Sequence, residues 1–209
     1  YCVDNDVKKI NDLNKGNIPI FEPGLKEILI KNYNQKRLIF TTNIKDAVFK
    51  SDIIFICVGT PTNKINNSAN LNYVYNVAKK ISKFINKYKI IVTKSTVPVT
   101  TGDKIEKIIK KGKNKKIVDI VSNPEFLREG EAIRDFNFPD RIIVGTDSVK
   151  ANKMLKNLYE PLIKKGGKYL NTSRRGAELI KYASNSFLAT KITFINEIAN
   201  LCEKTDVNI

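Results

Sequence analysis

Two carboxylates beyond an apolar run are the side chains in this sequence best placed to do chemistry. Glu125 and Glu129 follow Asn123-Pro124, which ends a run at 116–121 (KIVDIV) that is typical of a buried strand in a parallel sheet. Pro124 cannot donate to a strand ladder, so we expect the chain to leave the sheet there. If Pro124 opens a helical turn, the four-residue spacing places both carboxylates on one face, where they could exchange protons or bind a polar ligand. The alternative is that they only favour the positive end of a helix dipole.

Hydroxyl side chains follow two other apolar runs. The run 52–58 (DIIFICV) leads into the turn 59–62 (GTPT), and the run 90–93 (IIVT) is followed by Ser95 and Thr96. Ligands of open α/β sheets bind beyond the carboxyl ends of the strands. A phosphate or a ribose could therefore approach the backbone at these two turns.

An acidic residue closes the first short apolar strand, at 1–3. An acid at the end of the second strand of a dinucleotide-binding unit accepts hydrogen bonds from the adenosine ribose, and Asp4 has that place. The glycine fingerprint of such a unit lies about 20 residues upstream, so we expect it to precede Tyr1. Taken alone, Asp4 is more often the N-cap of the helix expected at 7–14. Lys9 lies one helical turn later on the same side.

The last segment has a different pattern. Residues 174–204 form an uninterrupted helical pattern, much of it apolar, which is far longer than an average helix. Such a helix usually bridges domains or forms a dimer seam. Lys181 and Asn185 are four residues apart and share one face. Without further context, Lys181 is expected to extend its ammonium to solvent and Asn185 to be an ordinary surface residue.

The remaining elements alternate between strand and helix with short links, which predicts a doubly wound parallel α/β sheet. Strands are expected at 1–3, 38–41, 52–58, 90–93, 116–121, 141–144 and 168–170. Helices are expected at 7–14, 44–50, 71–86, 101–111 and 150–164, and a further helix follows the loop at 17–25 and ends near residue 32.

Composition narrows the function classes. The net charge is +16, but the lysines are scattered over the polar faces of helices and are not interleaved with aromatic residues along one strip. A solvated basic surface, suited to a phosphorylated ligand, is therefore favoured over nucleic-acid binding. With no histidine and with three cysteines that lack metal-ligand spacing, a zinc site or a histidine-based triad is not expected. No run is long enough to span a bilayer, and we expect a reduced, cytoplasmic protein.

Four motifs stand in order along the chain, and two longer runs accompany them. They are FEPGL (21–25), VGTPT (58–62), KSTVPV (94–99) and NPEFLREG (123–130), with FPDRIIVG (138–145) and the helical run AELIKYASNSFLATKITFINEIANLCE (177–203). Several motifs in register are far more specific than any one alone. Together they resemble the UDP-glucose/GDP-mannose dehydrogenase family over nearly the whole chain, and the members that oxidise UDP-glucose are the most similar.

The resemblance implies a Rossmann-like NAD-binding domain over 1–172 and a central helix over 173–209 that joins two domains and forms the core of a homodimer. The implied reaction oxidises UDP-glucose to UDP-glucuronate by two successive hydride transfers, through a thiohemiacetal and a thioester on a cysteine. Such chemistry needs an activated nucleophile, a cation beside developing oxyanions, and a carboxylate to handle water. Two alternatives stay open. One is a related dehydrogenase of GDP-mannose or a UDP-N-acetylhexosamine, and the other is a non-catalytic nucleotide-binding or dimerisation module.

Position by position, the resemblance implies five residues that contact NAD. Asp4 and Lys9 match contacts at and near the adenosine ribose, Thr60 matches a contact in the GTPT turn, and Glu129 matches another. Thr96 matches a hydroxyl that contacts NAD and helps to position water.

The resemblance also implies catalytic and substrate-binding residues. Glu125 matches the general base of thioester hydrolysis, Lys181 matches the cation that stabilises the oxyanion, and Asn185 matches its partner. Catalytic roles are thus implied for Thr96, Glu125, Lys181 and Asn185, and substrate contacts for Glu125, Phe126, Leu127, Arg128, Glu129, Lys181 and Asn185.

The chain also departs from the family pattern. The nucleophilic cysteine, a catalytic aspartate and the UDP-binding domain are expected beyond Ile209, and none of the three cysteines matches the nucleophile. Thr100 stands where the family usually has glycine, so the backbone there is less free to turn. We therefore expect this stretch alone to be inactive.

Overall fold

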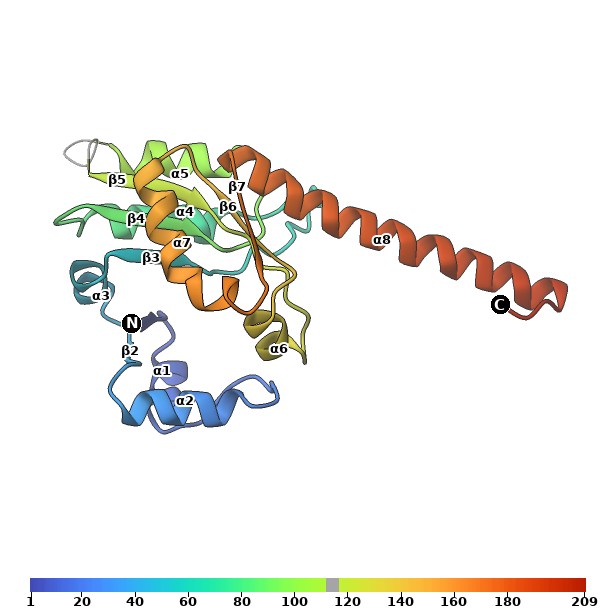
Figure 1. Cartoon of the computed structure of the whole chain (residues 1–209), viewed down its shortest axis with the longest axis horizontal. Helices are drawn as coiled ribbons and strands as arrows, with labels where there is room; N and C mark the ends of the chain where they lie inside the picture. The colour runs from blue at the N-terminus through green and yellow to red at the C-terminus, as the bar shows by residue number, and fades with distance from the viewer. Residues whose placement is uncertain (112–116) are drawn as a thin grey trace.

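A five-stranded sheet forms the centre of the computed structural model, which describes residues 1–111 and 117–209 (Figure 1). The strand order is β3-β4-β5-β6-β7. The strands are β3 (Ile53–Ile56), β4 (Lys89–Thr93), β5 (Val118–Ser122), β6 (Arg141–Gly145) and β7 (Lys168–Thr172). All neighbours pair in parallel except β5 and β6, which meet antiparallel at Ser122 and Gly145. The predicted α/β class is confirmed, with one antiparallel pair in a sheet that was expected to be parallel throughout.

Helices cover both faces of this sheet. Helices α4 (Asn72–Ser82) and α5 (Thr101–Ile109) pack on one face, where β3, β4 and β5 contribute Ile56, Ile91 and Ile120 to the core. Helix α7 (Val149–Ile163) packs on the other face. Because strands covered on both sides have no solvent face, their sequences are continuous apolar runs instead of alternating ones.

A smaller layer formed by the first residues lies beside the main sheet. Strands β1 (Cys2–Val3) and β2 (Phe40–Thr41) pair in parallel, and helices α1 (Val7–Asn14) and α2 (Leu25–Asn34) accompany them. This layer has its own core around Ile10, Leu29 and Phe40. Helix α3 (Ile44–Lys50) then leads into β3, as Figure 1 shows.

Most predicted elements form, and their ends move. The helices expected at 7–14 and 44–50 have those limits, whereas the strands expected at 38–41 and 52–58 are shorter, and α4 ends before residue 86. The strand expected at 116–121 begins at Val118, and Lys116 lies outside the described residues.

The helical turn considered at Pro124 is absent from the described structure, so that prediction was wrong. The backbone from Asn123 to Arg128 is irregular, and the next helix is α6 (Ala132–Asn137). The reason lies in distant partners of the backbone. The Arg128 N–H donates to the Asp135 carboxylate at 2.9 Å, and the carboxylate of Glu22 accepts from Gly130 N–H at 2.8 Å. With these N–H groups bonded to side chains, a helix does not start at Pro124.

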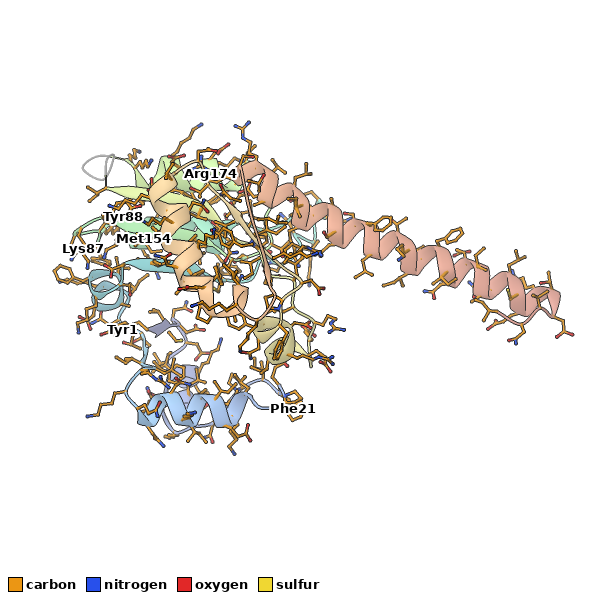
Figure 2. The ribbon with its side chains drawn as sticks, in the orientation of Figure 1. Tyr1, Phe21, Lys87, Tyr88, Met154 and Arg174 are labelled. Carbon is orange, nitrogen blue, oxygen red and sulfur yellow. The ribbon has the colours of Figure 1, made fainter. Side chains whose placement is uncertain are left out.

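Helix α8 (Arg174–Thr205) is a single helix, as predicted for 174–204. Ser173 caps it, since its Oγ accepts from Gly176 N–H at 3.1 Å. The first turns pack against β5 and β6, and the remainder projects far from the body (Figure 1). Figure 2 shows the side chains of this projecting part pointing outward on every side. Within residues 1–111 and 117–209, no helix is both long and apolar enough to cross a membrane.

Candidate active site

Three side chains from separate elements meet beyond the carboxyl ends of β4 and β5. Thr96 follows β4, Glu125 follows β5, and Lys181 lies in the second turn of α8. The Thr96 hydroxyl donates to Glu125 Oε1 at 3.3 Å, and Lys181 Nζ lies 3.4 Å from the same oxygen. Lys181 is only 8% exposed, so its ammonium is held against the carboxylate and does not extend to solvent. Thr96, Glu125 and Lys181 form the candidate active site.

A cleft of about 420 Å³ adjoins this site. Thr60 joins the turn after β3 to the turn after β4, because its hydroxyl donates to the Thr96 carbonyl oxygen at 3.0 Å. Asn185 lines the same cleft, so the face shared by Lys181 and Asn185 points toward the strand ends. Further residues of α8, which no sequence motif singled out, also line the cleft. They are Tyr182, Ser186 and Ala189. Helical spacing was the available signal, because Tyr182 and Ala189 lie three and four residues from Asn185, and Ser186 lies four residues after Tyr182.

A second polar group that the sequence analysis did not assign lies beside the site. Lys94 Nζ donates to Asn123 Oδ1 at 3.3 Å, and the Tyr159 hydroxyl donates to the same oxygen. Asn123 Nδ2 in turn donates to the Ile143 carbonyl at 2.7 Å, which fixes the amide. Burial lowers the pKa of Lys94, and the charge of Glu125 partly opposes that shift. Lys94 opens the KSTVPV motif, so its position in that motif was the available signal.

Phe126 provides an apolar wall for the site. Lys181 Nζ lies 5.1 Å from the centre of its ring, and the Arg141 guanidinium lies 4.3 Å from it. Cations over an aromatic face are attracted by its quadrupole, so Phe126 helps to hold both.

The next three residues of the segment implied for substrate contacts lie at the surface. Leu127, Arg128 and Glu129 are exposed. Both Arg128 Nε and Nη2 donate to the carboxylate of Asp135, at 3.0 and 2.7 Å. The Arg128 guanidinium, together with the Arg128 N–H, lowers the pKa of Asp135 to about 2. From this segment, Glu125 and Phe126 contact Lys181, and Glu129 is exposed.

Asp4 and Lys9 pair with each other, away from the candidate active site. Lys9 Nζ lies 2.7 Å from Asp4 Oδ2, and this contact lowers the pKa of Asp4. The alternative role of Asp4 as the cap of α1 is wrong, because Asp6 is the N-cap and accepts from Lys9 N–H at 3.0 Å. Asp4 stands at the carboxyl end of β1 with about a third of its side chain exposed, which fits a carboxylate that accepts from ribose hydroxyls.

Two family models match the chain. The model of the UDP-glucose/GDP-mannose dehydrogenase family, NAD binding domain, matches residues 1–163, and the model of the family's central domain matches residues 175–209. The chain belongs to the UDP-glucose/GDP-mannose dehydrogenase family. The strand ends that carry Thr60, Thr96 and Glu125 thus belong to the family's NAD-binding domain, and the part of α8 that lines the cleft belongs to its central domain.

Similar sequences within the family carry UDP-glucose in their names. The chain is 50% identical to a UDP-glucose 6-dehydrogenase of Rhizobium meliloti, over all of this chain and 48% of that protein. It is 47% identical to UDP-glucose 6-dehydrogenase TuaD of Bacillus subtilis, over all of this chain and 44% of that protein. The chain therefore spans about half the length of the curated relatives that it matches.

Solved structures of the family agree with the fold. A ternary complex of GDP-mannose dehydrogenase from Pseudomonas aeruginosa has a TM-score of 0.93 at 35% identity, over 99% of this chain and 48% of that one. A UDP-glucose dehydrogenase from Pyrobaculum islandicum has a TM-score of 0.90 at 36% identity, over 96% of this chain and 46% of that one. The predicted Rossmann-like class and the predicted family are both confirmed.

Proposed function

We propose that the protein oxidises UDP-glucose to UDP-glucuronate with NAD⁺, by two successive hydride transfers at one carbon. The observation that carries the proposal is the meeting of Glu125, Lys181 and Thr96 at the strand ends of an NAD-binding domain. UDP-glucose is favoured among nucleotide sugars because relatives at 47 to 50% identity are UDP-glucose 6-dehydrogenases.

The residues that would hold NAD⁺ lie along the strand ends of both layers. Asp4 and Lys9 would contact the adenosine ribose, and Thr60 and Thr96 would contact the remainder of the cofactor, with Glu129 as a further contact. Bound NAD⁺ would accept the hydride that leaves the sugar carbon. The cleft beside Thr60 and Thr96 is lined by hydroxyl and amide groups, which suits the ribose and amide parts of such a cofactor.

Each member of the candidate active site has a distinct chemical capacity. The Lys181 ammonium can stabilise negative charge as it develops on the sugar oxygen, which matters most in a water-poor site. Glu125 can accept a proton from the water that hydrolyses an acyl intermediate. The Thr96 hydroxyl donates to Glu125 and holds it in reach of that water, and Asn185 would bind the sugar from the cleft.

A second substrate has one specific observation in its favour. The GDP-mannose dehydrogenase of Pseudomonas aeruginosa matches this fold at a TM-score of 0.93. GDP-mannose is therefore the second candidate.

We also propose a homodimer, formed through the projecting part of α8. Phe187, Phe194 and Leu201 recur every seven residues, and each is more than half exposed. A seven-residue apolar repeat forms a continuous stripe along a helix, and such a stripe is stabilised by burial against another surface.

The test measures NADH formed per UDP-glucose consumed, with the protein as its gene encodes it and with Glu125→Gln. We expect two NADH per sugar for the wild type. Glu125→Gln should form the acyl intermediate and then stall, since it lacks the base for hydrolysis, and mass spectrometry should detect a covalent sugar adduct. One NADH per sugar, or turnover of GDP-mannose with none of UDP-glucose, would contradict the proposal.

A further inference from the structure

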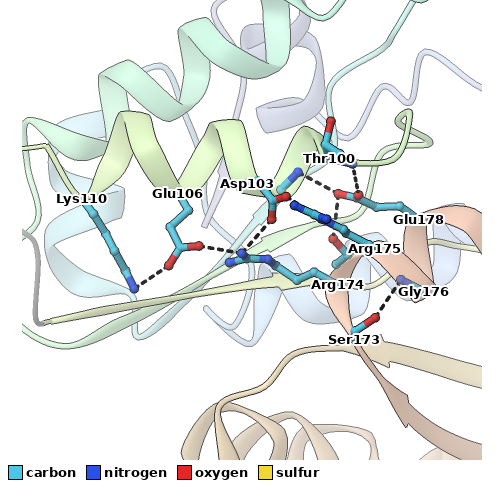
Figure 3. A network of polar contacts seen from close by, with 11 residues as sticks. Thr100, Asp103, Glu106, Lys110, Ser173, Arg174, Arg175, Gly176 and Glu178 are labelled. Carbon is cyan, nitrogen blue, oxygen red and sulfur yellow. Dashed lines mark hydrogen bonds and ion pairs between the residues drawn. The ribbon is translucent and has the colours of Figure 1, made fainter.

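A buried carboxylate on α8 binds the start of α5. Glu178 is 3% exposed and lies one helical turn before Lys181. Its Oε2 accepts from Thr100 N–H at 2.8 Å, and its Oε1 accepts from Gly102 N–H at 2.7 Å and from the Ser122 hydroxyl at 3.2 Å (Figure 3). Burial raises the pKa of Glu178, and these donors partly offset the rise.

Glu178 serves as the cap of α5 from another element. Within the described residues, Thr100 occupies the N-cap position but its side chain does not cap the helix. Thr100 also adopts a left-handed backbone with φ +79°, which a β-branched residue tolerates poorly. A carboxylate at a helix N-terminus bonds free N–H groups and complements the dipole. Gly102 allows the close approach, because a Cβ there would lie 3.0 Å from Glu178 Oε1.

The two segments that Glu178 joins both carry residues of the candidate active site. Thr100 lies four residues after Thr96 in the connection between β4 and α5, and Lys181 lies one turn after Glu178 on the same side of α8. Glu178 therefore links the loop that carries Thr96 to the helix that carries Lys181.

A separate set of ion pairs also attaches the first turn of α8 to α5. None of these ion pairs involves Glu178. Arg174 contacts Asp103 at 2.9 Å and Glu106 at 2.6 Å, and Arg175 contacts Asp103 at 2.8 Å (Figure 3). These pairs involve side chains of α5 at Asp103 and Glu106, whereas Glu178 binds backbone N–H groups. Among these contacts, that of Glu178 is the closest along α8 to Lys181.

We infer that Glu178 is a positioning residue, which sets Lys181 and Thr96 against Glu125 by clamping α8 to the start of α5. The inference rests on the proposed function only for its effect on turnover. A carboxylate is required because its two oxygens accept three donors, and an amide would place an N–H₂ group against an N–H.

The test is a double-mutant cycle of Glu178→Gln and Lys181→Met, made in the protein as its gene encodes it. We expect Glu178→Gln to lower kcat about 10- to 100-fold, the size of effect that a small misplacement causes, with KM for NAD⁺ changed less than about threefold. The double variant should fall short of the additive loss by about fivefold or more, because Glu178 acts in part through Lys181. An additive double variant would overturn the inference.

The matched control is Asp119→Asn, which likewise replaces a carboxylate by an amide, at a partly buried position. Asp119 accepts from the hydroxyls of Tyr88 and Ser148, both at 2.6 Å, near the amino end of β5. We expect it to lower stability but to leave kcat within about twofold of wild type. An equal fall of kcat in both variants would mean that Glu178 is merely structural, and would overturn the inference. If Glu178→Gln does not fold, Glu178→Asp, which withdraws the same carboxylate by one methylene, replaces it in the cycle.

Hydrogen exchange separates this inference from the proposed function. Glu178→Gln should speed amide exchange about tenfold or more at Thr100 and Gly102, whatever the substrate, and Asp119→Asn should not. If the wild type does not oxidise UDP-glucose, the proposed function fails while this readout still decides the clamp. Unchanged exchange at both amides would overturn the clamp.

Discussion

The two parts of α8 differ in what they bury. In its first turns, Ala177, Glu178 and Lys181 are buried, and two of these carry charge. In the projecting part, apolar side chains are exposed, with Phe194 at 64%. One helix thus buries polar groups where it meets the sheet and exposes apolar ones beyond it. The first part therefore has the pattern of a functional site, where buried charges are paired. The second part has the pattern of an interface, where exposed apolar side chains pack against another surface.

The largest expected effect concerns the first part. Lys181→Met should lower kcat for UDP-glucose oxidation about 10²- to 10³-fold, since it removes the cation beside the reacting oxygen. Steady-state NADH formation measures it. The matched control is Lys204→Met, an exposed lysine at the far end of the same helix, which should leave kcat within about twofold. A change of less than about fivefold for Lys181→Met would remove the distinction between the two parts.

A substitution in the projecting part of α8 should affect self-association. Phe194→Asp should weaken self-association about 100-fold or more, because burying an unpaired carboxylate in an apolar seam costs several kcal/mol. Light scattering over a concentration series measures the mass in solution. Asn196→Asp adds the same charge at another exposed position of the helix and serves as the control. A dimer that survives Phe194→Asp unchanged would place the interface elsewhere.

Packing of the first turns of α8 against β6 should depend on Gly145. A Cβ at this residue would lie 2.6 Å from the Ala177 Cβ and 2.7 Å from the Ser173 carbonyl oxygen, so Gly145→Ala must shift α8 or β6. We expect a loss of about 1–3 kcal/mol in the free energy of unfolding, the usual cost of overpacking. Urea unfolding of the 209-residue chain measures it. Gly59→Ala is the control, because a Cβ there meets nothing within 4 Å.

The smallest effect separates two neighbouring arginines. Arg174 is 18% exposed and Arg175 is 66% exposed, although both bind Asp103. Arg174→Met should cost about 2 kcal/mol because it removes one cation from each of two partly buried carboxylates, Asp103 and Glu106. Arg175→Met should cost less than about 1 kcal/mol because water screens its ion pair. Equal losses on urea unfolding would contradict this ranking.

The free energy of unfolding should also depend on pH through Asp103 and Glu106, the carboxylates that bind these arginines. Burial tends to raise the pKa of Asp103 and Glu106, but their bonds to Arg174, Arg175 and Lys110 outweigh it, so both lie below the ordinary 3.8 and 4.5. A lowered carboxyl pKa adds stability above the unfolded-state value, and that stability disappears as pH falls through the folded-state value. The loss caused by Arg174→Met should therefore be full above pH 4.5 and shrink below pH 3.8.

Much of the site was predictable from local sequence. Strand ends follow from apolar runs that stop at Pro, Gly or hydroxyl residues, and side chains beyond such ends gather at one edge of a parallel sheet. Thr60, Thr96 and Glu125 were predicted at such ends, and the structure brings them together with Lys181. The helical turn predicted at Pro124 was wrong because contacts between residues far apart in the sequence decide the backbone there. Glu22 lies 108 residues from Gly130, so its bond to that backbone leaves no periodic signal.

The sequence by itself determined the order of strands and helices, the length of α8 and the chemical groups at the strand ends, because periodicity and turn residues act over a few neighbours. Only the tertiary structure decided which face of α8 meets the sheet, and that Lys181 lies against Glu125. The contacts that decide this, such as Glu178 with Thr100, join residues 78 positions apart. Bonds of that kind depend on how whole elements pack, and packing is a property of the folded molecule.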